Sequence, residues 1–162
     1  MAQENLSKTF NNALNVKTVS STETLKKTDS GKLIALDMST GFTLTLPPCE
    51  AGLNFKILIK AGGTDGNMKI AAAPGDCFFG SIVSTAVVAN DKISVQSIQY
   101  SAATGTPGNY DHLTLDGDAT TSGGLSGEVI DLIAVDSSAW AVNALLTIAG
   151  TSAASIAVIN AG

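Results

Sequence analysis

The residues best equipped for chemistry are few, and the first of them is a histidine beside a carboxylate. His112 is the only histidine of the chain and directly follows Asp111, so the pair could act as a general base held by a carboxylate. One histidine leaves no spare for a Ser-His-Asp triad and no histidine-based metal cluster. Because His112 follows Tyr110 in a polar stretch, we interpret it as a surface residue.

Two pairs of acidic residues could also serve a reaction or a cation. Asp116 and Asp118 flank a glycine in a weak likeness of a Ca²⁺-binding loop, but the third ligand and the distal glutamate are missing, which favours an Asx-rich turn. Glu128 and Asp131 could form the carboxylate pair of a glycosidase. On a strand, an offset of three residues places them on opposite faces, which excludes that pair.

The two cysteines and the tryptophan have plain structural interpretations. Cys49 and Cys77 lie far apart without CxxC spacing and have no basic neighbour in sequence to activate a thiol, so each is expected to pack as a small buried hydrophobe without a disulfide. Trp140 could stack on a sugar, but its small and apolar neighbours Ala139 and Val142 favour a core tryptophan. The sequence therefore predicts no catalytic residues, no enzymatic activity, no metal and no cofactor.

The composition points to a single β-rich domain with a surface poor in charge. The chain has 162 residues, of which 44% are hydrophobic, and its mean hydropathy is +0.27, so it is long and apolar enough for a real core. Only 14% of the residues are charged, against about 25% in ordinary soluble domains. Such a surface favours a protein that is packed against partners, although a β-rich monomer could also have it.

The charges themselves exclude one class of partner. All nine basic residues are lysines, and fourteen acidic residues give a net charge of −5. Nucleic-acid binding relies on arginine contacts and net positive charge, so it is excluded as a main function. No apolar run approaches 18 residues, and the N-terminus lacks the apolar core of a signal peptide, so we expect neither secretion nor membrane insertion.

The elements that must position all these residues are strands. Between Gly41 and Gly80 two alternating segments, Phe42–Leu46 and Leu53–Ala61, are separated by a Pro-Pro stop and precede a third segment, 67–72, in a pattern typical of a β-meander. Further strands are predicted at 32–37, 92–100, 129–135, 140–148 and 155–159, with Trp140 pointing inward and a phase change before Leu145. Many short strands and turn signals predict an all-β fold, a jelly-roll-like antiparallel β-sandwich over residues 16–162.

Residues 1–15 differ from the rest and form a predicted N-terminal arm. Leu6, Phe10 and Leu14 recur at i, i+4 and i+8, the spacing of one apolar face of a short helix. Such a short helix is marginal in water and needs a surface to lie on. Two interpretations stay open: a terminus that frays or caps its own sheet, and an arm that docks on a neighbouring subunit.

Two segments carry a resemblance to a known group of proteins. The first runs from the DSGK turn at Asp29 through FTLTLP to the strand that begins after Gly52, and the second runs from Gly127 to Val142. Both are similar to β-sandwich virion proteins of tailed phages, including capsid decoration (cement) proteins and fibre modules. In that family a glycine commonly follows the Trp-x-Val unit, where this chain has Asn143 and Ala144.

The resemblance implies a jelly-roll-like domain, often a homotrimer, mounted on the outside of a capsid and made in the host cytoplasm. The major capsid protein is the partner it implies, and Leu6, Phe10 and Leu14 are the expected capsid contacts. The alternative is a phage fibre or receptor-binding module that binds carbohydrate, in which Trp140 or Tyr110 would be exposed to meet glycan.

Overall fold

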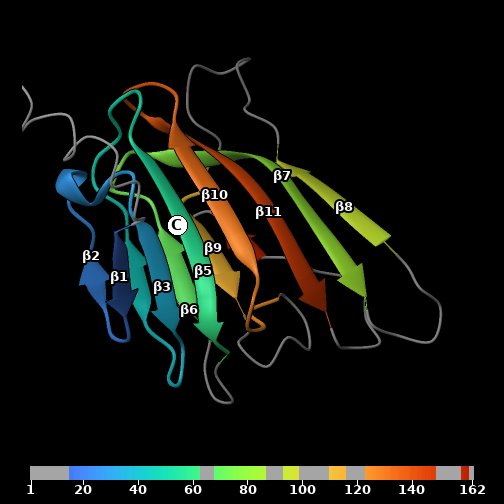
Figure 1. Ribbon diagram of the computed structural model, residues 1–162. Coiled ribbons are helices and arrows are strands. Elements are labelled where there is room, and N and C mark those ends of the chain that lie inside the picture. Colours follow the sequence, from blue (N-terminus) through green and yellow to red (C-terminus); the bar gives the residue numbers. More distant parts are fainter. Residues whose placement is uncertain are drawn as a thin grey trace, which may run out of the picture.

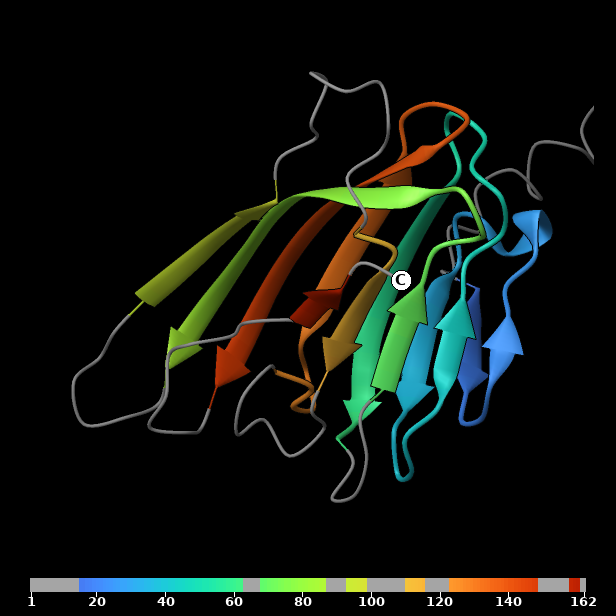
Figure 2. The same ribbon diagram turned by 180° about the vertical axis from the view of Figure 1, so that it is seen from behind.

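The protein folds as two β-sheets packed face to face (Figures 1 and 2). The computed structural model describes residues 15–62, 68–86, 93–98, 110–115, 123–148 and 158–160. Its strands are β1 (Val16–Val19), β2 (Glu23–Thr24), β3 (Leu33–Asp37), β4 (Thr43–Thr45), β5 (Asn54–Ala61), β6 (Met68–Ala71), β7 (Cys77–Ala86), β8 (Ile93–Ile98), β9 (His112–Leu115), β10 (Val129–Ala134), β11 (Ala139–Ile148) and β12 (Val158–Asn160). One sheet has the order β1-β3-β5-β10-β11-β7-β8 and the other β12-β9-β6-β4-β2. The predicted all-β, two-sheet architecture is confirmed.

The strands expected to form a meander instead alternate between the two sheets. β4 and β6 belong to the five-stranded sheet, whereas β5 and β7 belong to the seven-stranded sheet, so the predicted meander is wrong. Apolar alternation reports which face of a strand is buried, and a strand facing the core from either sheet has the same alternation. The connections, including Pro47 and Pro48, carry the chain across the sandwich rather than back along one sheet.

This alternation produces a two-layered coil in the N-terminal half. β1, β3 and β5 pair parallel in one sheet, and β2, β4 and β6 pair parallel in the other. β10 then pairs antiparallel with both β5 and β11, while β11 pairs parallel with β7. The expected purely antiparallel pairing is therefore wrong, and the fold is mixed. Figure 2, seen from the opposite side, shows β2, β4 and β6 lying side by side in front of the larger sheet.

The core lies between the sheets and contains the residues that the alternation predicted. From β5 the side chains of Phe55, Ile57 and Ile59 are buried, while Lys56 and Lys60 are exposed. The opposite sheet contributes buried apolar residues from its own inner face: Leu44, Leu46, Met68, Ile70, Leu113 and Leu115. A half-buried strand that alternates in this way gains its stability from burial of one face.

Two details of the sequence interpretation are corrected by the structure. In β11 the alternation continues without interruption, with Leu146 buried and Leu145 exposed, so the expected phase change is wrong. The stretch from His112 to Leu115 forms β9, which lies in a polar context and was not expected as a strand. A 3-10 helix occupies Lys27–Asp29, in the region expected to be a connector and a turn.

The described residues include no helix long and apolar enough to cross a membrane.

Candidate interaction face

The outer face of the seven-stranded sheet presents an apolar row that crosses five strands. In register, Ala35 of β3 lies beside Leu58 of β5, which lies beside Val129 of β10. Val129 is in turn paired with Leu145 of β11, and Leu145 with Val83 of β7. Leu145 is 60% exposed, although burying a leucine side chain is worth about 1.5–3 kcal/mol. Ala35 is buried and Leu58, Val129 and Val83 are partly covered, so the exposed apolar surface of this row is concentrated at Leu145.

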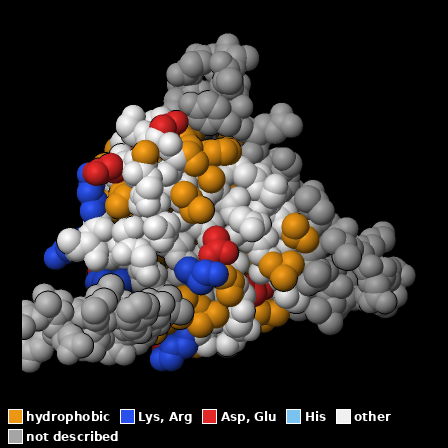
Figure 3. All heavy atoms as spheres, turned by 45° about the horizontal axis from the view of Figure 1, so that its top comes forward, with side chains coloured by type: hydrophobic (Ala, Val, Ile, Leu, Met, Phe, Trp, Pro, Cys, Tyr) orange, Lys and Arg blue, Asp and Glu red, His pale blue; other side chains and the backbone are white. Residues whose placement is uncertain are grey.

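A charged pair occupies the next row along the same face. Lys56 of β5 faces Asp131 of β10, with Nζ 3.1 Å from Oδ1. Both side chains are about half exposed, so solvent screens the pair and it contributes little to stability. Beyond it, Ile133 is 51% exposed and Val135 is also exposed. Apolar side chains thus lie on both sides of the ion pair, and Figure 3 shows adjoining basic and acidic side chains with hydrophobic ones around them.

An open hollow of about 490 Å³ lies over the same strands. Its polar side chains are Asn54, Lys56, Asp131 and Asn143, and the adjoining Ile133 contributes an apolar surface. These groups can donate and accept hydrogen bonds, so the hollow can bind a polar group.

The outer face of the five-stranded sheet is different in character. Lys69 of β6 is exposed and lies beside the partly exposed Thr43 of β4. On its other side Thr114 of β9 is buried, and Thr45, also partly exposed, lies beside Ala71. Threonine and lysine are typical of a sheet face that contacts water, because hydroxyl and ammonium groups keep their hydrogen bonds there. We define the interaction face as the outward residues Leu58, Val129, Leu145, Val83, Lys56, Asp131, Asn143, Ile133 and Val135 of the seven-stranded sheet.

His112 is not the surface residue that the sequence indicated. Its side chain is only 14% exposed, and Nδ1 lies 2.6 Å from Oδ1 of Asp111, so the histidine–carboxylate contact does form. It belongs to β9, which pairs with β6 and β12. Nε2, which would take a proton from a nucleophile, is buried without a hydrogen-bond partner among the described residues. No triad is therefore assembled around His112 in this part of the chain.

Glu128 is buried, and the structure gives it a structural role that the sequence did not indicate. Its carboxylate accepts hydrogen bonds from the backbone N–H groups of Gly124, at 2.6 Å, and of Thr147. Burial raises the pKa of Glu128, and these backbone donors oppose the rise. Asp131 points outward instead, to Lys56, so the two carboxylates do lie on opposite faces. The inward position of Glu128, just before an alternating strand, was the available signal.

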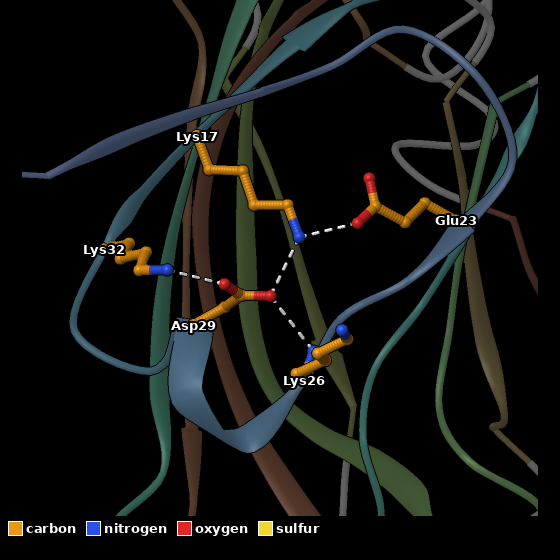
Figure 4. Close-up of polar contacts among 5 residues, drawn as sticks. All are labelled: Lys17, Glu23, Lys26, Asp29 and Lys32. Atoms are coloured by element: carbon orange, nitrogen blue, oxygen red, sulfur yellow. Dashed lines mark hydrogen bonds and ion pairs between the residues drawn. The ribbon is translucent and has the colours of Figure 1, made fainter.

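The strongest electrostatic cluster surrounds Asp29 (Figure 4). Its buried carboxylate lies 2.8 Å from Nζ of Lys17 and 2.7 Å from Nζ of Lys32, and it accepts a hydrogen bond from the backbone N–H of Lys26. Lys17 also contacts Glu23 at 2.6 Å. The lysine hydrogen bonds, Lys17 first, hold the pKa of Asp29 well below its ordinary value. The cluster links β1 to the 3-10 helix. The carboxylate oxygens of Asp29 already accept hydrogen bonds within the chain, so the cluster has a structural role.

The cysteine and tryptophan interpretations are confirmed. Cys49 and Cys77 are buried free thiols, and burial raises the pKa of both, which makes them poor nucleophiles. Trp140 is fully buried, so it cannot serve as a sugar platform on the surface. Its core position follows from the inward alternation of β11.

Several predicted residues lie outside the described part of the chain. Leu6, Phe10 and Leu14, the expected capsid contacts, belong to residues 1–14, and Asp116 and Asp118 to residues 116–122. Among the described residues, no three His, Cys, Asp or Glu side chains gather in a way that could hold a metal ion.

No protein-family model matches the sequence, and the curated proteins contain no match to it. Within the described residues, the most extensive candidate site is the interaction face of the seven-stranded sheet.

Proposed function

We propose that this chain is a structural virion protein, a capsid decoration (cement) protein of a tailed phage that binds the outer capsid surface and stabilises the shell. The observation that carries the proposal is the interaction face, an apolar row with Leu145 60% exposed, on a chain with only 14% charged residues. Large exposed apolar patches mark surfaces that bind other proteins. The DSGK and Trp-x-Val segments resemble virion β-sandwich proteins, so we assign the binding partner to the proteins of the virion.

The N-terminal arm, residues 1–15, is the proposed attachment to the major capsid protein. The chain enters β1 at Val16, and β1 is the edge strand of the seven-stranded sheet, so the proposed arm joins the domain at the edge of that sheet. Leu6, Phe10 and Leu14 supply the apolar contacts in this proposal. On a capsid lattice that holds three copies together, three linked contacts would multiply the attachment strength without new contacts.

The relation to jelly-roll virion domains is part of the same proposal. A jelly roll is a double sheet whose chain passes repeatedly between the two layers, and the alternation of β1 to β7 between sheets has that character. The departure is the parallel pairing of β1 with β3 and of β3 with β5. We propose that the protein is related to such domains, because its strands alternate between the sheets and its sequence resembles theirs. The parallel pairing of neighbouring strands is a feature in which it differs from them.

A second candidate is a fibre or receptor-binding module that recognises carbohydrate. The observation that favours it is the hollow, where Asn54, Asp131 and Asn143 could hydrogen-bond hydroxyl groups, together with the exposed side chain of Tyr110. Aromatic stacking usually accompanies such hydrogen bonding, but Trp140 and Phe55 are both buried. Decoration of the capsid remains the better supported function.

The decisive experiment compares capsid attachment of the full chain with that of a variant lacking residues 1–15. The capsids are purified without this protein, and bound protein is measured by co-sedimentation. We expect the full chain to bind and to raise the temperature at which the capsid releases its DNA, and the truncated chain to do neither. Trp140 emission checks that the truncated domain is folded.

A matched control separates the apolar stripe from the rest of the arm. The triple change of Leu6, Phe10 and Leu14 to serine should abolish attachment, whereas changing Asn11 and Asn12 to serine should preserve it. Undiminished attachment of the truncated, folded chain would refute the role of the arm. Failure of the full chain to bind any capsid, combined with binding to host glycans, would favour the fibre module.

A further inference from the structure

We infer that the interaction face binds the same face of a second copy of this chain, giving a dimer with twofold symmetry. This contact is independent of capsid attachment through the arm. A twofold contact uses one patch twice, whereas a ring of three uses two different patches. Any threefold arrangement of the proposed decoration protein would then come from the capsid lattice.

The first argument is the difference between the two outer faces of the sandwich. The five-stranded sheet shows Thr43, Thr45 and Lys69 to solvent. The seven-stranded sheet shows Leu145 and Ile133, each more than half exposed. Since both faces belong to the same chain, composition alone does not explain the contrast. An apolar sheet face is stable in water when a second apolar face covers it, about 10 Å away in stacked sheets.

The second argument is the charge pattern, which is complementary to itself. Lys56 and Asp131 lie side by side on neighbouring strands, 3.1 Å apart. A twofold axis that runs along the strands between β5 and β10 places Lys56 over the partner's Asp131 and Asp131 over the partner's Lys56. Each charge then meets the opposite charge in the other copy, and the chain needs no second protein to complement the pair.

The third argument is that the same axis superimposes apolar on apolar. Leu58 and Val129 are cross-strand partners on β5 and β10, at equal height along the strands. The rotation that exchanges Lys56 with Asp131 therefore places Leu58 against the partner's Val129, and the reverse. Leu145 extends this row by one strand. One twofold rotation thus matches the charged row and the apolar row at the same time. A face that binds an unrelated protein would not need to be complementary to itself in this way.

The first test is the solution mass of the purified full chain, by light scattering and sedimentation equilibrium over a range of concentrations. We expect a mass of about twice 16.4 kDa for the unchanged chain and for Thr45→Lys, a control on the other outer face. Leu145→Lys should lower the mass to that of one chain, because it puts an ammonium group into the apolar row. Trp140 emission shows that each variant is folded.

The second test uses the charge pair in two variants. Lys56→Glu leaves two acidic groups in the middle of the face, and Asp131→Lys leaves two basic ones. Each variant alone should dimerise at least about tenfold more weakly, because like charges meet across the axis. An equimolar mixture of the two variants should form mixed dimers, because the acidic face of the Lys56→Glu chain then contacts the basic face of the Asp131→Lys chain.

Three results would overturn the inference. The first is that the unchanged chain is a monomer at every concentration. The second is that it forms an oligomer whose mass is the same in the Leu145→Lys variant. The third is that the mixture of the two charge variants stays monomeric. If the unchanged chain is monomeric but Leu145→Lys loses capsid attachment, the face belongs to the capsid protein instead. Loss of attachment on deleting residues 1–15 with the dimer intact would leave both proposals standing.

Discussion

Phe55 and Trp140 pack against each other inside the sandwich, with ring centroids 5.7 Å apart and ring planes tilted by 44°. They belong to β5 and β11, which are separated by β10 in the sheet. The residue paired with Trp140 on β10 is Ala134, whose small side chain leaves room for the indole to reach across the strand. This aromatic pair of the core thus links strands that share no backbone hydrogen bonds.

Trp140 is the only tryptophan, so its fluorescence reports this contact directly. We expect a blue-shifted emission maximum that acrylamide quenches little, because the indole is fully buried. Simple sugars and host glycans should leave the spectrum unchanged. A red-shifted emission that responds to sugar would contradict the buried position and favour the carbohydrate-binding module.

Asp29→Ala should lower the free energy of unfolding by about 2–3 kcal/mol at pH 7, measured by urea denaturation. The change leaves Lys17 and Lys32 without their buried carboxylate, and breaking such a pair costs about 3–5 kcal/mol where both partners are buried. The lysines are partly exposed here, which reduces the cost. Glu50→Gln removes the exposed pair with Lys27 and serves as the control, with little expected effect.

The contribution of Asp29 should also depend on pH. Its folded-state pKa lies below the ordinary value of a free aspartate, about 3.9, so the folded state holds the carboxylate in its charged form. The stability it contributes is present above about pH 4 and is lost as the pH falls toward the folded-state pKa. The difference between the unchanged chain and Asp29→Ala should therefore shrink on acidification. A constant difference down to pH 2 would contradict this electrostatic role.

Gly80→Ala should abolish folding or destabilise the protein by more than about 3 kcal/mol. Gly80 is paired with Val142 where β7 meets β11, and an added Cβ would lie 2.0 Å from the carbonyl oxygen of Val142. Its φ of 135° is also unfavourable for a side chain. Gly52→Ala is the matched control, with φ of 95° but nothing within 4 Å, so it should cost only about 1–2 kcal/mol of backbone strain. Equal effects in thermal or urea unfolding would show that the close approach of β7 and β11 is not limiting.

The sequence predicted the strands and the core well, because both depend on local alternation. β5 and β10 end within about one residue of their predicted bounds, and the inward residues Phe55, Ile57 and Trp140 are buried as expected. β9 was missed because its four residues follow a sequence stretch rich in Ala, Thr and Gly. A strand of that length gives too few alternations to recognise.

The pairing of strands and the interaction face could not be predicted in the same way. Alternation assigns Leu58 and Leu145 to the outside of their strands, but only the register shows that Val129 lies between them. The parallel pairs of the N-terminal half join strands about twenty residues apart, such as β3 and β5, and nothing local in either strand specifies that partner. The missing information is long-range.

That long-range pairing has a consequence for how fast the chain can fold. Of the described strand pairs, only β7–β8 and β10–β11 join strands that follow one another in the chain. Every other pair joins strands that are further apart in the chain. β5, for example, pairs with β10, which begins only at Val129. Topologies dominated by such contacts fold in milliseconds to seconds rather than microseconds. On the ribosome, the larger sheet cannot be completed until β10 and β11 have emerged, although the parallel pairs among β1 to β6 need only the strands that precede them.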